Sequence, residues 1–289
     1  MLFAERLAAM LKVTPANLAK LDSYGERDRK RLLVELGEHE FARCADDPIY
    51  WMDGRQRDGY HYVYTWDNHP QFKCNICGDT TEQTYSFNKL HTHLQVRHNM
   101  GVLKAADVRH HFSELSAIQG FPMKDYMPPI IEYWMKEPLM LVEKSRDMMA
   151  TWLVVVLYTW DTIFHQGRHN VFQSEKAPKT AELVRRAYHV WKHQPWWLKK
   201  HKFVYTVGGE KAGVLRCETL NSEIMGIAQG SEQIRQYHPS GMFTDETAFH
   251  KDAAATFGAV KPAIQSGGKY TGVSTANPGW FHQAVMDLY

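Results

Sequence analysis

Two short apolar runs near the end of the sequence are each followed at once by a pair of polar residues. Gly241–Thr244 and Lys269–Val273 have the length and composition of buried β-strands, and Asp245-Glu246 and Ser274-Thr275 come directly after them. Between the two runs, residues 253–257 favour a helix, and a Ser-Gly-Gly turn leads into the second strand. The pattern predicts a strand, an acidic pair, a helix, a second strand and a hydroxyl pair.

Strands and helices are also predicted to alternate in the preceding hundred residues. Apolar runs predict further strands at 138–143, 170–174, 202–207 and 214–218. Helices are predicted at 152–164 and 181–191, and the second of these should face the core with Leu183, Val184, Ala187, Val190 and Trp191. Such alternation is typical of an α/β fold with a mainly parallel sheet.

The first 72 residues are expected to form helices followed by loop and strand. Thr14-Pro15 fits a helix cap followed by proline at the first helical position, and a charged helix is predicted from Arg27 to Leu36. Residues 46–72 are predicted as loop and strand. One strand face there should carry Tyr60, Tyr62, Tyr64 and Trp66.

The polar pairs after the two C-terminal strands suggest a nucleotide site. In an open parallel sheet, ligands bind beyond the carboxyl ends of the strands, so both pairs would face one crevice. Asp245 could hold Mg²⁺ through water, Glu246 could orient or deprotonate the attacking water, and Ser274-Thr275 could sense the γ-phosphate. The alternative is that Asp245-Glu246 only caps the helix that follows, since acidic residues favour helix N-termini.

A second motif, at residues 74–98, has the spacing of a zinc finger. Cys74 and Cys77 form a C-x2-C knuckle, and His93 and His98 follow with the x4 spacing of a Cys2His2 site. His91 is a competing ligand, but on a helix it would face away from His98. A closed Cys2His2 site would hold structural Zn²⁺. The alternative is a reduced thiol pair with unrelated histidines.

The overall composition neither requires nor excludes nucleic acid. The 289 residues are 44% hydrophobic with a net charge of +2, and no secretory signal opens the chain. The most apolar run, 153–158, is far shorter than the roughly 20 residues of a membrane span, so we expect a soluble intracellular protein. A basic run at 199–202 beside Trp196-Trp197 is either a solvated face or a contact to the DNA backbone. The predicted finger could also contact DNA, through Lys89, His91 and Arg97. It could instead bind protein or only stabilise an inserted segment.

The segment 144–151, between the strand at 138–143 and the helix at 152–164, has the layout of a phosphate-binding loop without its usual sequence. Amides at a helix N-terminus can cradle phosphates. However, the G-x-x-x-x-G-K-[ST] string is absent: Ala150 stands where the lysine should be and Met149 stands for the second glycine. The Cβ of Met149 restricts a backbone that glycine would leave free.

The C-terminal motifs closely resemble those of phage terminase large subunits. The ATPase domain of that family carries a "DEAAF" Walker B motif and an "STANP"-like coupling motif, which here are residues 245–249 (DETAF) and 274–278 (STANP). The resemblance covers about residues 40–289, with the finger as an insertion. It implies a RecA-like sheet and an ATPase site with ATP and Mg²⁺, where Asp245 completes the metal site and Glu246 activates water.

The resemblance also assigns roles further upstream. Some family members have deviant Walker A loops that begin Lys-Ser, so it implies that Lys144, Ser145, Arg146 and Thr151 hold the triphosphate and Mg²⁺. Residues 123–131 resemble the family's adenine motif. Tyr126 would stack on the base there, although Met127 replaces the glutamine that reads adenine, and a core position for both is the alternative. Arg235, in a stretch similar to the family's "G…IRG", is a candidate γ-phosphate sensor or a surface arginine.

The function implied is the ATP-hydrolysing motor of a viral terminase, which translocates double-stranded DNA into a procapsid. We expect a helical region with a lead-in strand at 1–72, a zinc-finger-like module at 73–100 and the ATPase core at 101–289. Implied partners are the portal, the small terminase subunit and further copies in a ring, in the host cytoplasm at the procapsid portal. Family members continue into a nuclease, so we expect a fragment or a motor half without it. The alternative is a non-hydrolysing DNA-binding or docking subunit with a degenerate nucleotide site.

Overall fold

The computed structural model divides the chain into two compact units. The larger comprises Met1–Val63 and Phe121–Tyr289, and the smaller comprises Tyr64–Gly120, so it extends on both sides of the expected 73–100 module. The structure describes residues 26–57, 61–66, 72–78, 80–81, 87–114, 118–208, 211–230, 234 and 237–288. The predicted cap at Thr14-Pro15, Tyr60 and Arg235 lie outside these residues.

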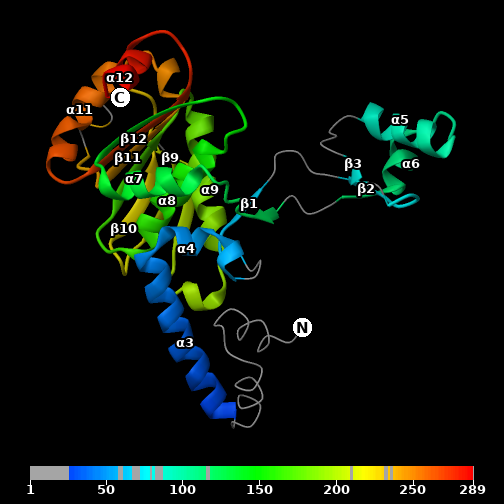
Figure 1. The fold of residues 1–289 in the computed structure, drawn as a ribbon, viewed down its shortest axis with the longest axis horizontal. Coiled ribbons are helices and arrows are strands. Elements are labelled where there is room, and N and C mark those ends of the chain that lie inside the picture. The colour runs from blue at the N-terminus through cyan, green and yellow to red at the C-terminus, as the bar shows by residue number, and fades with distance from the viewer. Residues whose placement is uncertain are drawn as a thin grey trace. The chain divides into compact units, whose positions relative to one another are not determined.

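A seven-stranded sheet forms the centre of the larger unit, and it is mostly parallel, as the sequence predicted (Figure 1). The strand order is β6-β12-β11-β7-β10-β9-β8, in which the first five strands are mutually parallel and β9 is antiparallel to both of its neighbours, β10 and β8. The strands are β6 (Leu139–Lys144), β7 (His169–Gln173), β8 (Val204–Gly208), β9 (Lys211–Cys217), β10 (Ser222–Gly226), β11 (Gly241–Asp245) and β12 (Lys269–Thr275). The sequence did not predict β10.

Helices cover both faces of this sheet. The helices of the larger unit that pack on or border the sheet are α7 (Met127–Lys136), α8 (Ala150–Phe164), α9 (Ala177–Lys192), η3 (Thr247–Phe249), α11 (Ala253–Gln265) and α12 (Trp280–Leu288). Alternate residues of β11 face opposite layers: Met242 packs in one cluster with Val260 of α11, whereas the ring of Phe243 stacks 6.3 Å from that of Tyr158 on α8. Every residue of β11 is buried, as expected for a central parallel strand.

The most apolar run of the sequence lies inside α8. Residues 153–158 are all buried, and the hydroxyl of Tyr158 donates to the carbonyl of Met242 (2.9 Å). Among the described helices, none has both the length and the apolar character that crossing a membrane requires. Residues 153–158 are therefore the core of an internal helix.

Residues 46–57 are helical, which corrects the prediction of loop and strand there. The charged helix α3 (Glu26–Asp46) runs ten residues beyond the expected end at Leu36, and α4 (Pro48–Met52) and η1 (Gly54–Arg57) follow it. Asp47 caps α4 by accepting a hydrogen bond from the amide of Tyr50 (2.9 Å), and Pro48 occupies the first turn. A capping residue directly before proline indicates a helix start. The prediction followed the alternating aromatic residues of this segment instead and so missed the helix.

The smaller unit consists of short strands and two helices. Its strands are β1 (Tyr64–Trp66), β2 (Phe72–Cys74), β3 (Thr80–Thr81), β4 (Phe112–Glu114) and β5 (Ile118–Gly120), and its helices are α5 (Phe87–His98) and α6 (Ala105–His110). The predicted aromatic strand is shorter than expected: Tyr64 and Trp66 lie on β1, whereas Tyr62 precedes it and is fully buried. The unit's core contains Cys74, Leu90, Leu94, Val108 and Phe112.

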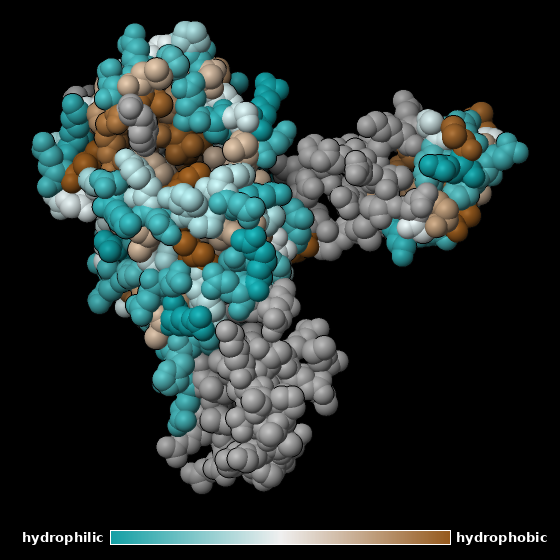
Figure 2. Space-filling model, viewed as in Figure 1, coloured by the Kyte–Doolittle hydropathy of each residue, from teal (hydrophilic) through white to brown (hydrophobic). Residues whose placement is uncertain are grey.

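Apolar surface remains exposed on the larger unit. Figure 2 shows it gathered in the region of α11 and α12. Helix α12 buries Phe281, yet leaves Met286 and Leu288 exposed.

Candidate functional site

The ends of three neighbouring strands bring the predicted polar residues together. Strand β12 lies between β6 and β11, and the register places Thr275 opposite Lys144 and Val273 opposite Asp245. All three strands are parallel, so their carboxyl ends meet at one edge of the sheet. The first turn of α8 begins at this edge, after the loop 144–149 that follows β6.

Asp245 ends β11 beneath the start of α8. Its carboxylate Oδ1 accepts a hydrogen bond of 2.8 Å from the hydroxyl of Thr151, 94 residues earlier in the chain. Burial raises the pKa of Asp245, and the Thr151 hydrogen bond opposes that rise. A buried carboxylate beside a hydroxyl is an oxygen-rich site, which is the ligand chemistry that Mg²⁺ prefers.

Glu246 turns its carboxylate toward the other two strands. Its Oε1 lies 3.4 Å from the Nζ of Lys144 at the end of β6. Its Oε2 accepts hydrogen bonds from the hydroxyls of Ser274 (3.4 Å) and Thr275 (3.3 Å) and from the amide of Thr275 (3.4 Å). The acidic pair, the hydroxyl pair and the loop lysine therefore form one connected set of contacts.

The helix-capping interpretation of the acidic pair does not describe these side chains. Glu246 stands at the N-terminus of η3, but its side chain makes no capping hydrogen bond. Its backbone adopts the left-handed conformation (φ 53°, ψ 43°), which is uncommon for a residue other than glycine, asparagine or aspartate. A strained backbone at a cluster of polar groups is typical of a functional site.

The loop before α8 has a left-handed backbone at the position where the common phosphate-loop sequence has its second glycine. Met149 has φ 50° and ψ 15°, a left-handed conformation, and Asp147 also has a positive φ of 63°. Met149 thus takes a conformation that glycine, which has no Cβ, would adopt at a lower cost. Ser145 and Arg146 are exposed on this loop, and the hydroxyl of Ser145 donates to the carbonyl of Arg146 (3.4 Å).

Tyr126 lies against the same loop. Its hydroxyl donates a 2.8 Å hydrogen bond to the carbonyl of Met148, and burial raises its pKa. Met127, the next residue, is fully buried at the start of α7. The core alternative is therefore correct for Met127, whereas Tyr126 is only half-buried and adjoins the loop.

Two residues near Asp245 were not predicted from the sequence. The ring of His250 is buried, and its Nε2 lies 2.9 Å from the backbone carbonyl of Asp245. Burial lowers the pKa of His250, against opposing effects of that hydrogen bond and of Glu175 and Glu246. Arg186 on α9 places its guanidinium 4.9 Å from the ring centre of Trp152 and acts to lower the pKa of Asp245. A lone histidine or arginine in a sequence carries no signal of such proximity.

The four predicted zinc ligands converge in the smaller unit. The ligand atoms of Cys74, Cys77, His93 and His98 all lie within 4.8 Å of one another. The Sγ of Cys74 is 3.4 Å from Nε2 of His98, and the Sγ of Cys77 is 3.5 Å from Nε2 of His93. Ligands held about 2.0–2.3 Å from one tetrahedral ion lie about 3.3–3.8 Å apart, so the two sulfurs and two ring nitrogens suit Zn²⁺.

His91 does not compete for this cluster. Its Nε2 accepts a hydrogen bond of 3.0 Å from the amide of Leu103, which fixes the loop after α5. Unrelated histidines would not converge on both thiols, so the cluster favours the zinc-site interpretation over a reduced thiol pair. Arg97 is exposed on α5.

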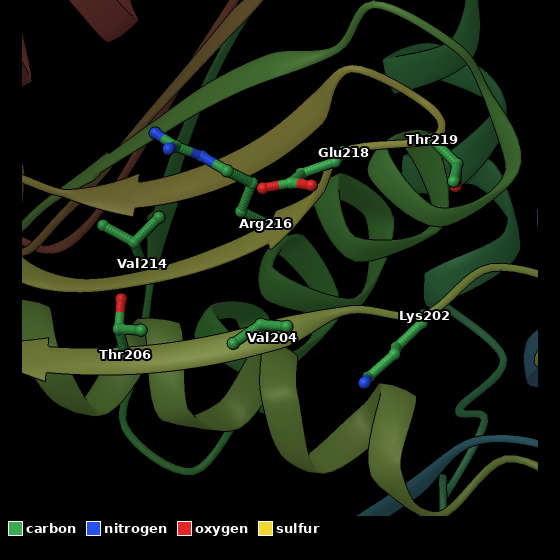
Figure 3. Close-up of a pocket in the computed structure, with 7 residues that line it drawn as sticks. All are labelled: Lys202, Val204, Thr206, Val214, Arg216, Glu218 and Thr219. Carbon is green, nitrogen blue, oxygen red and sulfur yellow. The ribbon is translucent and has the colours of Figure 1, made fainter.

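A separate groove of about 640 Å³ lies on β8 and β9, toward the opposite end of the sheet from β6 (Figure 3). Val204, Thr206, Val214 and Arg216 line it from alternate positions of the two strands, while Tyr205 stacks on Tyr188 of α9 across the sheet. Two lysines of the adjoining basic run, residues 199–202, contact other parts of the same chain. The Nζ of Lys199 donates to the carbonyl of Lys192 (2.6 Å), and that of Lys200 lies 4.4 Å from the ring centre of Phe41.

No protein-family model and no curated protein matches this sequence. Solved structures that resemble this chain include phage large terminases. They include the large terminase ATPase domain of Thermus phage P74-26 (9% identity, TM-score 0.43, 57% of this chain and 69% of that one). The HK97 bacteriophage large terminase is also similar (15%, 0.46, 58% and 37%), as is a thermophilic bacteriophage large terminase in complex with ADP (8%, 0.39, 53% and 39%).

Proposed function

We propose that the edge formed by β6, β11 and β12 binds ATP with Mg²⁺ and hydrolyses it. The observation that carries this proposal is the contact set around the acidic pair, in which Thr151 bonds Asp245 and Lys144 pairs with Glu246. These are the parts that phosphoryl transfer requires: a hydroxyl and a carboxylate for the metal, a cation for phosphate, and a carboxylate for water.

The residues present fit both groups. Thr151 and Asp245 offer oxygen ligands for Mg²⁺ beside the N-terminus of α8, where backbone amides favour phosphate. Lys144, Ser145 and Arg146 are the polar side chains at the front of the loop, and Tyr126 adjoins it. Bound Mg²⁺ would supply neutralisation of charge on the phosphates.

In this proposal Glu246 acts on the attacking water. Its carboxylate is held by Lys144 on one side and by Ser274 and Thr275 on the other, so its orientation is fixed before a nucleotide arrives. A positioned general base contributes on the order of 10²–10⁴-fold to a rate. Ser274 and Thr275 contact the base directly, which makes them the residues through which hydrolysis is transmitted to β12.

We propose further that this ATPase is the packaging motor of a viral terminase with a RecA-like core. The proposal rests on the DETAF and STANP motifs, both of which begin at the proposed site. In this role the chain would act on double-stranded DNA, in a homo-oligomeric ring at the procapsid portal in the host cytoplasm, with the small terminase subunit as a partner. Arg235 is the candidate γ-phosphate sensor.

A second candidate function, a non-hydrolysing DNA-binding or docking subunit, is favoured by one observation. Met149 and Ala150 replace the glycine and lysine of the common phosphate loop, and Met149 is held in a left-handed backbone. A degenerate site has no chemical need for Glu246, however, and the carboxylate of that residue contacts Lys144, Ser274 and Thr275.

A DNA-stimulated ATPase assay on the purified chain separates the two functions. The motor proposal expects turnover that rises when double-stranded DNA is added, because hydrolysis and translocation are coupled. The docking proposal expects DNA binding with no phosphate release. Absence of both ATP binding and phosphate release, with or without DNA, would contradict the motor proposal.

For the smaller unit we propose a structural Zn²⁺ bound by Cys74, Cys77, His93 and His98. All four ligands are protein atoms, which leaves no position open for a substrate. Cys74 also belongs to the unit's core with Leu90 and Leu94, so metal binding and packing would stabilise the same fold.

A further inference from the structure

The turn that carries Glu246 is hydrogen-bonded to residues at the end of β12 and just after it. The hydroxyl of Ser274 accepts a 3.1 Å hydrogen bond from the amide of Ala248, and the amide group of Asn277 donates to the carbonyl of Ala248 (3.1 Å). These bonds hold η3 against the end of β12. They do not touch the peptide group that joins Asp245 to Glu246, whose orientation decides the backbone conformation of Glu246.

His250 contacts that peptide group. After η3 the chain folds back, and the Nε2 of His250 reaches the carbonyl oxygen of Asp245 at 2.9 Å. A carbonyl can only accept, so the proton of this bond sits on Nε2. The other ring nitrogen of His250, Nδ1, is buried and has no hydrogen-bond partner among the described residues. The Asp245 carbonyl is therefore the only hydrogen-bond partner of this ring among those residues.

Lys251, the residue after His250, is also held by a hydrogen bond. In the amide orientation that satisfies both of its hydrogen bonds, Gln229 accepts from the amide of Lys251 (2.8 Å) and donates to the carbonyl of Glu175 (3.2 Å). The backbone that follows His250 is therefore anchored to the segments after β7 and β10. This anchor gives the imidazole a fixed base from which to hold the Asp245 carbonyl.

We propose that His250 is a positioning residue for Glu246: its ring N–H holds the Asp245 carbonyl and keeps the Asp245–Glu246 peptide in the orientation that aims the Glu246 carboxylate at Lys144 and Thr275. A peptide group is planar, so a rotation of this carbonyl also rotates φ of Glu246. The left-handed φ of 53° costs free energy for a residue with a Cβ, so an unheld peptide would rotate to relieve it. The catalytic consequence rests on the proposed ATP hydrolysis, whereas the structural consequence does not.

The test compares His250→Leu, which fills the space without a donor, with His250→Gln, whose terminal N–H can take the place of Nε2–H. We expect turnover of His250→Leu to fall on the order of 10²-fold, the cost of a misplaced catalytic group. ATP affinity should stay close to that of wild type, and His250→Gln should recover most of the rate. His165→Leu is the matched control, because His165 follows α8 at the opposite edge of the sheet.

A crystal structure of His250→Leu gives a second readout that needs no activity. We expect Glu246 to leave the left-handed region and its carboxylate to leave Lys144. If His250→Leu does not fold, His250→Asn, whose amide is too short to span the same gap, replaces it. The inference would be overturned if the variant without the donor kept wild-type turnover and Glu246 did not move. It would also be overturned if that variant lost rate, affinity and stability together and His250→Gln did not recover them. An inactive wild type would instead count against the proposed function, and the crystal structure would then decide the role of His250.

Discussion

The ammonium of Lys144 lies 3.4 Å from the carboxylate of Glu246, although the two residues are 102 positions apart and their strands are separated by β12. Both side chains are largely shielded, with exposed fractions of 13% and 23%. The contact joins the front of the phosphate loop to the acidic turn. It supports the proposal that Lys144 is the cation of this site, since position 150 is an alanine.

Replacing Lys144 with alanine should weaken ATP binding. A charge-assisted hydrogen bond contributes roughly 1.5–3 kcal/mol, so we expect the dissociation constant to rise about 10- to 100-fold in a fluorescent-nucleotide titration. Lys179→Ala, an exposed lysine of α9, is the control and should bind like wild type. Unchanged affinity in Lys144→Ala would show that another group holds the phosphates.

Replacing Met149 with glycine should stabilise the protein. A non-glycine residue in the left-handed region costs roughly 1–2 kcal/mol, part of which is offset because glycine loses more entropy on folding. We expect a net gain of about 0.5 kcal/mol or more in the free energy of unfolding, measured in urea. Asp147→Gly should gain less, because aspartate tolerates a positive φ better than methionine. A loss of stability in Met149→Gly would contradict the strained-loop description.

His189 should make the larger unit sensitive to acid. Burial, followed by His193 and nearby cations, lowers the pKa of His189 from 6.5 to about 4, so the unfolded chain binds a proton at higher pH than the folded one. Its contribution to stability is therefore intact above pH 6.5 and is lost as the pH falls toward 4. Allowing for partial exposure, we expect a loss of about 2 kcal/mol over that interval.

Urea unfolding at several pH values checks this expectation. His189→Gln should remove this part of the acid sensitivity, so that the difference in stability between variant and wild type is constant above pH 6.5 and changes below it. His238→Gln, which changes an exposed histidine, is the control and should follow wild type. Parallel stability curves for wild type and His189→Gln would show that His189 does not titrate as described.

Removing one zinc ligand should empty the site in the smaller unit. Wild type is expected to hold one Zn²⁺ per chain by elemental analysis, and Cys74→Ser is expected to hold none and to lose protease resistance in Tyr64–Gly120. Cys217→Ser changes a buried cysteine of the larger unit and should keep the metal. Equal zinc in wild type and Cys74→Ser would rule out the proposed ligand set.

Fully buried parallel strands were the elements most readable in the sequence. β11 and β12 are short apolar runs bounded by polar or turn residues, which is the pattern that burial on both faces requires. β10 was missed because it contains a glutamate: the carboxylate of Glu223 is buried between Arg216 and His169 of the two neighbouring strands. That pairing exists only once the sheet has formed.

Residue type and order identified much of the candidate site, but its internal contacts could not be predicted. Spacing alone selected the four residues of the metal cluster, because ligand geometry constrains short segments of chain. The chain around Glu246 receives hydrogen bonds from Ser274 and Asn277 at Ala248 and from His250 at Asp245, and the first two partners lie 26 and 29 positions from Ala248. A local sequence pattern does not predict hydrogen bonds between residues so far apart in the chain.

Replacing Glu246 with glutamine tests the central claim most directly. Glutamine keeps the size and hydrogen bonding of the side chain but cannot accept a proton from water, so we predict that ATP turnover falls on the order of 10²–10⁴-fold while ATP affinity stays nearly unchanged. Asp245→Asn should differ, because it disturbs metal binding and so lowers both affinity and rate. Glu218→Gln, at the far end of the sheet, should behave like wild type in both measurements. A Glu246→Gln protein that hydrolyses ATP at the wild-type rate would contradict the proposed motor site.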